Sequence, residues 1–208
     1  GRGTADALSD IDVWVTFPDA VIGSALRDRW ALYADVGEVL VAHEMAPNRP
    51  PGGTYTLVLY ASTAGPLQVD WYLAPEASSR VDSAARTIFA DVTVPIGDIP
   101  TDAEAEQVIS LSERINWLAC MLFLAIKGIE RGGWNGFLEF LGKAYRETCS
   151  AHGFEGCAIT EPVSLDAVGT MLQQLERYAN EHQQRALREI ADFQRQLKRN
   201  TWAGFETI

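Results

Sequence analysis

The chain has 208 residues, of which 47% are hydrophobic, and its formal net charge is −11 at pH 7. Length and composition are typical of a soluble globular protein with one large or two small domains. The acidic balance argues against duplex nucleic acid as a partner, because that partner requires a basic footprint on the protein. A small polycationic substrate, in contrast, would suit an acidic cleft.

The first half of the chain predicts a small sheet with a flanking helix. Residues 10–17, DIDVWVTF, alternate between apolar and mixed positions with a period of two, which is typical of a strand. Residues 67–73, LQVDWYL, alternate in the same way. Asp10, Asp12 and Trp14 thus share one face of the first strand, and Gln68, Asp70 and Tyr72 share one face of the second. The other elements expected in this half are a helix over 19–33, a loop over 46–53, and strands over 38–42, 54–61 and 86–90.

The second half predicts helices. TDAE, residues 101–104, has the form of a capping box, and a long helix is expected from there to about Glu130. Its apolar run, WLACMLFLAI, is about half as long as a membrane-spanning helix must be, so it indicates a buried helix. Further helices are expected over 137–151, from near Ser164, and over about 182–199.

These elements predict an α+β chain of two domains. A small mixed sheet with flanking helices is expected over 1–98, and a helical bundle over 99–208. The chain has three cysteines, Cys120, Cys149 and Cys157, and this low, odd number argues against a disulfide framework. It is typical of a reducing compartment, and we expect a cytoplasmic protein.

Three carboxylates carry the chemical signal. Asp10 and Asp12 lie two residues apart on the first strand and so point to the same side of it, and Asp70 lies in the middle of a later strand. Clustered negative charges cost free energy unless a positive charge compensates them. Three carboxylates form a hard oxygen site for Mg²⁺ or Mn²⁺, and such ions can clamp a phosphoryl group during displacement. Ordinary turn or surface acids are the alternative interpretation.

GRGTADALSDIDVWV, residues 1–15, resembles the signature of the DNA polymerase β-like nucleotidyltransferase superfamily. It is most similar to the antibiotic nucleotidyltransferases that act on aminoglycosides and lincosamides. The matching residues are Arg2-Gly3, Ser9-Asp10-Ile11-Asp12 and Asp70. The resemblance implies a catalytic domain followed by a helical domain that helps to hold the acceptor.

The resemblance also implies roles for the matching residues. Asp10 and Asp12 would bind the metal ions that hold a nucleoside triphosphate. Asp70 would be a third metal ligand or the general base that deprotonates the acceptor hydroxyl.

The triphosphate would be contacted by further residues. Ser9 and the loop around Arg2 and Gly3 would touch its phosphates. Lys127 could line the triphosphate side of a cleft. For Arg2 a solvated loop arginine is the alternative, and for Lys127 a charge on a helix surface.

The expected reaction is transfer of a nucleoside monophosphate, with ATP as the favoured donor, to a hydroxyl of an aminoglycoside or lincosamide. Mg²⁺ or Mn²⁺ would be the cofactor and pyrophosphate the second product. The expected partners are this small acceptor and the triphosphate, without duplex nucleic acid or membrane, and the chain could form a homodimer.

Two alternatives stay open. One is a nucleotidyltransferase that acts on a protein or an RNA. The other is a catalytically silent binding module of the same fold. One feature favours this module. The family's Gly-Ser turn would precede Gly1, and Gly23-Ser24 cannot take its place because it follows Asp10 and Asp12.

Overall fold

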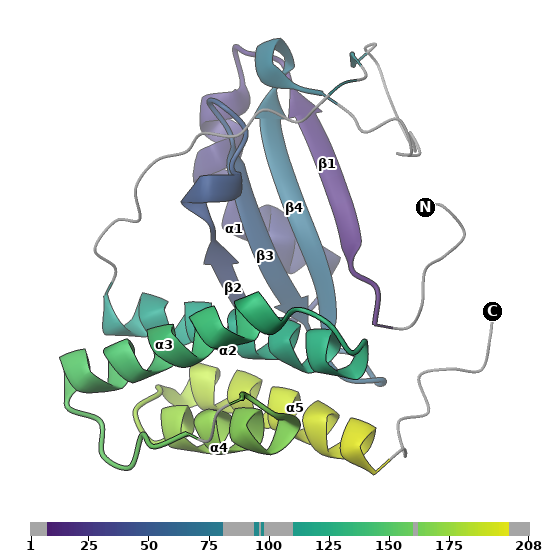
Figure 1. Ribbon diagram of the computed structural model, residues 1–208. Helices are drawn as coiled ribbons and strands as arrows, with labels where there is room; N and C mark the ends of the chain where they lie inside the picture. Colours follow the sequence, from purple (N-terminus) through teal and green to yellow (C-terminus); the bar gives the residue numbers. More distant parts are fainter. Residues whose placement is uncertain (1–7, 81–93, 96, 98–109, 160–161, 200–208) are drawn as a thin grey trace. The chain divides into compact units, whose positions relative to one another are not determined.

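The computed structural model describes residues 8–80, 94–95, 97, 110–159 and 162–199 (Figure 1). These residues form a four-stranded sheet and five α-helices, consistent with the α+β class. The elements in chain order are β1 (Ile11–Phe17), α1 (Ile22–Val36), β2 (Val39–Glu44), the 3-10 turn η1 (Ala46–Asn48), β3 (Thr54–Tyr60), β4 (Leu67–Pro75), the 3-10 turn η2 (Glu76–Ser78), α2 (Leu111–Glu130), α3 (Asn135–His152), α4 (Leu165–Glu176) and α5 (Glu181–Lys198).

The chain divides into two compact units. The first consists of Gly1–Val39, Glu44–Val58 and Gln68–Val108. The second consists of Leu40–His43, Leu59–Leu67 and Ile109–Ile208.

The sheet has the strand order β1-β4-β3-β2, with β1 at one edge (Figure 1). β1 and β4 run parallel, with Ile11 opposite Val69 and Phe17 opposite Pro75. A short turn joins β3 to β4, and neighbouring strands joined so closely run antiparallel. The strands at 54–60 and 67–75 end within two residues of the predicted limits.

Helix α1 packs against one face of the sheet. The Tyr33 hydroxyl donates a hydrogen bond of 3.0 Å to Thr56 Oγ1, and the Tyr33 ring packs against Trp71 with ring centroids 5.4 Å apart. Because side chains alternate along β4, Trp71 lies on the face opposite to Asp70 and Tyr72. The α1 helix therefore leaves the carboxylate-bearing face to other groups.

The start of α1 differs from the predicted one. The helix begins at Ile22 rather than at residue 19. Pro18 begins a separate turn whose carbonyl accepts from the Val21 amide at 2.9 Å. Asp19 is held outside the helix because its carboxylate accepts the amide of Ala77 at 3.3 Å. The strand expected over 86–90 lies outside the described residues.

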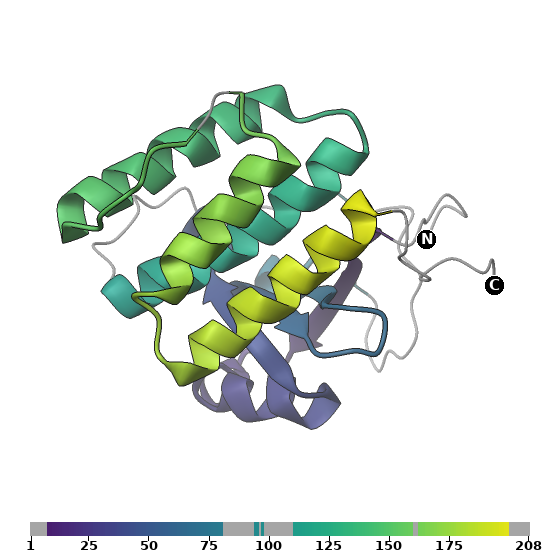
Figure 2. The same ribbon diagram turned by 90° about the horizontal axis from the view of Figure 1, so that it is seen from below.

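Helix α2 is the centre of the second unit. It packs against α3, α4 and α5, and most of its side chains are buried (Figure 2). Its capping box is formed by Ser110 and Glu113, whose backbone amides bond to each other's side chains at 2.7 and 3.2 Å. The helix therefore begins at Leu111, about ten residues later than predicted, because Ser110 and not Thr101 caps it. The box expected at 101–104 lies outside the described residues. None of the described helices has both the length and the apolar character needed to cross a membrane.

The cysteines correct one expectation. Cys149 and Cys157 form a disulfide, with their Cα atoms 6.2 Å apart, whereas their low number argued against one. The bridge forms because α3 ends at Gly153, which has a left-handed backbone (φ 65°) and turns the chain back. Cys120 is buried on α2 and takes no part in the bridge. The cytoplasmic location stays a prediction.

Candidate functional site

The strand pairing brings two of the predicted carboxylates side by side. In the parallel register of β1 and β4, Asp12 lies opposite Asp70, and Trp14 lies opposite Tyr72. Asp10 stands one residue before β1 and continues the same face, because side chains two apart on a strand point the same way. The candidate site therefore lies at the start of β1 and in the middle of β4.

The three carboxylates differ in exposure. Asp70 is buried, with 7% of its surface exposed, whereas Asp10 and Asp12 are exposed. The Gln68 amide joins two of them, because its Nε2 donates to Asp70 Oδ1 at 2.9 Å and to Asp10 Oδ2 at 3.3 Å. An amide donor thus stands between two carboxylates.

The environment of Asp70 changes its acidity. Burial raises its pKa from 3.8 to about 6. The hydrogen bond from Gln68 lowers this pKa, the charge of Asp10 raises it, and a hydrogen bond from the Tyr55 hydroxyl lowers it. Two donors therefore hold Asp70 in place, and the remaining negative charge around it is incompletely compensated.

A row of aromatic side chains continues the same face of the sheet. Trp14 stacks on Tyr72 with ring centroids 4.9 Å apart, and Tyr72 packs against Tyr55 with centroids 4.7 Å apart. Burial, followed by the charge of Asp70 for Tyr55 and of Asp12 for Tyr72, raises the pKa of both phenols. Both are therefore neutral donors at physiological pH. Within the described residues the buried Trp14 Nε1 has no hydrogen-bond partner.

The donor set suits a hard divalent cation. Carboxylate oxygens are the ligands that Mg²⁺ and Mn²⁺ prefer. The pKa of Asp70 is raised mainly by burial, and the charges of Asp10 and Asp12 add to this. In the described part of the chain, no three acidic, histidine or cysteine side chains are grouped closely enough to surround one ion. The Gln68 amide lies between Asp10 and Asp70, and it would have to move for both to share an ion.

The other predicted site residues have different positions. Ser9 is half-buried and directly precedes Asp10, while Arg2 and Gly3 lie outside the described residues. Lys127 belongs to the second unit, on α2. It is 1% exposed and its Nζ lies 5.8 Å from the centre of the Phe123 ring, so it is not a charge on the helix surface.

Sequence reasoning placed Trp14, Gln68 and Tyr72 on the carboxylate face but assigned them no role. The period-two alternation that identified the face could have included them, because it applies to every residue of the strand. Tyr55 had no such signal. Its proximity to Asp70 depends on β3 being the neighbour of β4, which the pattern of one strand does not reveal.

The chain was also compared with known proteins. No family model, no curated protein and no solved structure matches it. The site must therefore be interpreted from its own residues.

Proposed function

We propose that the protein is a metal-dependent nucleotidyltransferase that transfers a nucleoside monophosphate to a hydroxyl group of a small acceptor. One observation carries the proposal: Asp12 lies opposite Asp70 on neighbouring parallel strands, and Asp10 extends the same face. Strands are poor in aspartate, and nothing in the packing of an α/β sheet requires several aspartates on one face. The resemblance of residues 1–15 to the nucleotidyltransferase signature supports the same reaction.

The different exposures of the three carboxylates suggest different roles for them. Asp10 and Asp12 are exposed and are the residues that would hold the metal ion. When bound, that ion would neutralise the triphosphate and stabilise charge that develops during displacement at the α-phosphorus. The two exposed carboxylates would thereby position the nucleotide next to β4.

Asp70 has a different environment, which suits a general base. Gln68 and Tyr55 donate hydrogen bonds to it and so fix its orientation. A positioned carboxylate can accept the proton of the acceptor hydroxyl as the oxygen attacks phosphorus, and pyrophosphate then leaves. The acidic chain favours a cationic acceptor of the aminoglycoside type.

The test is pyrophosphate release from Mg-ATP in the presence of single aminoglycosides and lincosamides. We expect release that depends on one antibiotic class. Asp12→Asn should lower turnover by at least about a hundredfold, because an amide holds a divalent cation much less well than a carboxylate. The matched control is Asp35→Asn, which changes an exposed aspartate of α1 in the same unit and should leave turnover unchanged.

Each other outcome has a definite meaning. Near-wild-type turnover in Asp12→Asn would contradict the assigned site. If no antibiotic causes pyrophosphate release, but label is transferred from ATP to a protein or an RNA, the acceptor is a macromolecule. Silence with all acceptors would favour a binding module without catalytic activity.

A further inference from the structure

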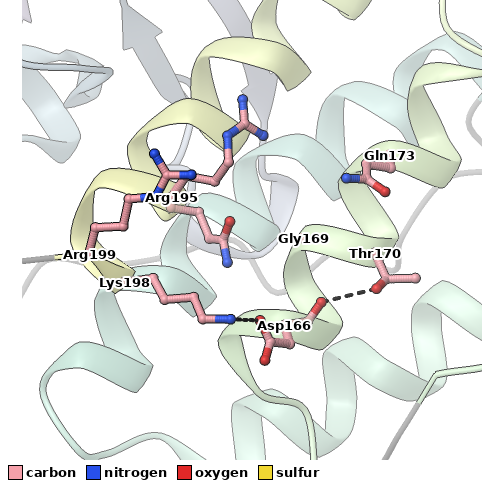
Figure 3. Close-up of a pocket in the computed structure, with 8 residues that line it drawn as sticks. Asp166, Gly169, Thr170, Gln173, Arg195, Lys198 and Arg199 are labelled. Atoms are coloured by element: carbon pink, nitrogen blue, oxygen red, sulfur yellow. Dashed lines mark hydrogen bonds and ion pairs between the residues drawn. The ribbon is translucent and has the colours of Figure 1, made fainter.

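A polar groove lies between α4 and α5 in the second unit (Figure 3). Its lining residues are far in the sequence from the carboxylates of the candidate site. Its volume is about 430 Å³. It lies where α4 begins and α5 ends, since Lys198 of α5 forms an ion pair with Asp166 of α4. At the other end of the helix pair, Arg188 forms an ion pair with Glu176 at 3.4 Å.

Each helix presents one face to this groove. Asp166, Thr170 and Gln173 are spaced by four and three residues along α4, so they project from the same side of it. Arg195 and Lys198, together with Arg199 just after the end of α5, follow the same spacing rule. The groove is therefore a product of two regular helix faces.

The groove has the opposite charge to the rest of the chain. Among the described lining residues, three side chains are cationic and one, Asp166, is a carboxylate. The whole chain carries a net charge of −11. A local positive site in an acidic protein favours a compact anion over polyanionic nucleic acid, because the surrounding negative charge opposes an extended polyanion.

The cations are available for exchange. Arg195 forms an ion pair with Asp192 on its own helix, and Lys198 with Asp166, and all four side chains are about half exposed or more. Exposed ion pairs contribute little to stability, so a bound anion could replace either carboxylate at small cost. Asp166 would act as a competitor for the ligand, because it occupies one of the cations that the ligand needs.

The uncharged side chains of the groove determine which kind of ligand body can carry the anionic group. The described residues that line the groove include no aliphatic or aromatic side chain; Thr170, Gln173 and Gln194 supply hydroxyl and amide groups. Gln194 is buried, and its Nε2 donates to the Leu165 carbonyl at 2.9 Å, so it forms a fixed wall. A volume of about 430 Å³ is larger than a bare phosphate needs and lies in the range of small-molecule sites.

We propose that this groove binds a small phosphorylated sugar or polyol. Arg195, Lys198 and Arg199 bind the phosphate group by charge-assisted hydrogen bonds. The Thr170 hydroxyl donates to the Asp166 carbonyl at 3.1 Å, so its oxygen accepts from a ligand hydroxyl, and Gln173 binds another ligand hydroxyl. Among the described lining residues there is no aromatic side chain on which a nucleobase could stack.

The test is titration of the full chain with glucose 6-phosphate, inorganic phosphate and glucose, followed by calorimetry and by amide chemical shifts. The buffer contains EDTA, so that no metal-dependent binding at the carboxylates contributes. We expect saturable binding of glucose 6-phosphate, weaker binding of phosphate, and no binding of glucose. Shift changes should centre on residues 166–173 and 194–199.

Three variants should weaken, strengthen or leave unchanged the binding of glucose 6-phosphate. Lys198→Gln should weaken glucose 6-phosphate binding roughly tenfold, the ratio that corresponds to about 1.4 kcal/mol. Asp166→Asn should strengthen binding severalfold, because it removes the competing carboxylate. Arg188→Gln is the matched control: it removes a cation of α5 that pairs with Glu176 outside the groove, and it should leave binding unchanged.

Three outcomes would overturn the proposal. These are the absence of saturable binding at millimolar concentrations, equal weakening by Arg188→Gln and Lys198→Gln, and equal affinity for phosphate and glucose 6-phosphate. The last outcome would leave a site for the anion alone. Because the assay needs neither metal nor turnover, its result is independent of the proposed transferase activity.

Discussion

Replacing Asp70 by asparagine should stabilise the metal-free protein at neutral pH although it removes a residue of the candidate site. Asp70 is 7% exposed, and its pKa is about 6 instead of its ordinary value of 3.8. A pKa that is raised in the folded state means that ionisation opposes folding. The stability is fully present below the unfolded pKa and is lost as the pH rises through about 6.

The size of this loss follows from the two pKa values. At about 1.4 kcal/mol for each pH unit, the difference between 3.8 and about 6 corresponds to about 3 kcal/mol at neutral pH, as an order of magnitude. Asparagine has no charge to desolvate, and its carbonyl oxygen can still accept from Gln68. Because its amide group needs new partners, we expect a gain of about 1–3 kcal/mol for Asp70→Asn.

The assay is urea denaturation with EDTA at about pH 3, below the unfolded pKa, and at about pH 7.5, above the folded pKa. The variant should be clearly more stable than the wild type at the higher pH and nearly equal to it at the lower pH. Asp35→Asn, on the exposed side of α1, serves as the control and should shift neither value. An Asp70→Asn protein that is less stable than the wild type at neutral pH would refute the reasoning.

Three further predictions concern the fold. Gly53→Ala should lower the free energy of unfolding by about 2–3 kcal/mol, because a Cβ there would lie 2.1 Å from the Leu73 carbonyl oxygen. Gly23→Ala in α1 should instead raise the free energy of unfolding by about 0.5–1 kcal/mol, since the added Cβ would lie 4.0 Å from its nearest neighbour, a side-chain atom of Arg27. Urea midpoints that move in the same direction for both glycine variants would contradict these two predictions. Asn180→Ala should cost about 1 kcal/mol and lower the Tm, because the Asn180 side chain accepts the Gln183 amide at 3.0 Å; an unchanged Tm would show that this cap is dispensable.

The strands illustrate how far a local pattern can be followed. The alternation in 10–17 and 67–73 predicts two strands and assigns their residues to faces, and both strands are found at β1 and β4. This succeeds because the period of two is a property of the extended backbone itself. Helix limits were less accurate. α1 begins three residues late, because Asp19 bonds to the distant Ala77 amide.

Several contacts at the sites could not be predicted from local sequence patterns. No local signal predicted that Tyr55 donates to Asp70 or that Lys127 is buried. The pairing of Cys149 with Cys157 was likewise not predicted, because it depends on the left-handed turn at Gly153. Each of these contacts depends on neighbours chosen by packing.

The sequence by itself determined the types of most elements, the face on which each strand carries its carboxylates, and the acidic charge of the chain. Only the tertiary structure decided that β1 lies beside β4 with Asp12 opposite Asp70, and that α4 and α5 enclose a basic groove. The physical reason is that side-chain direction follows from backbone geometry within a few residues. Strand order and register instead result from the collective burial of side chains that are far apart in the chain.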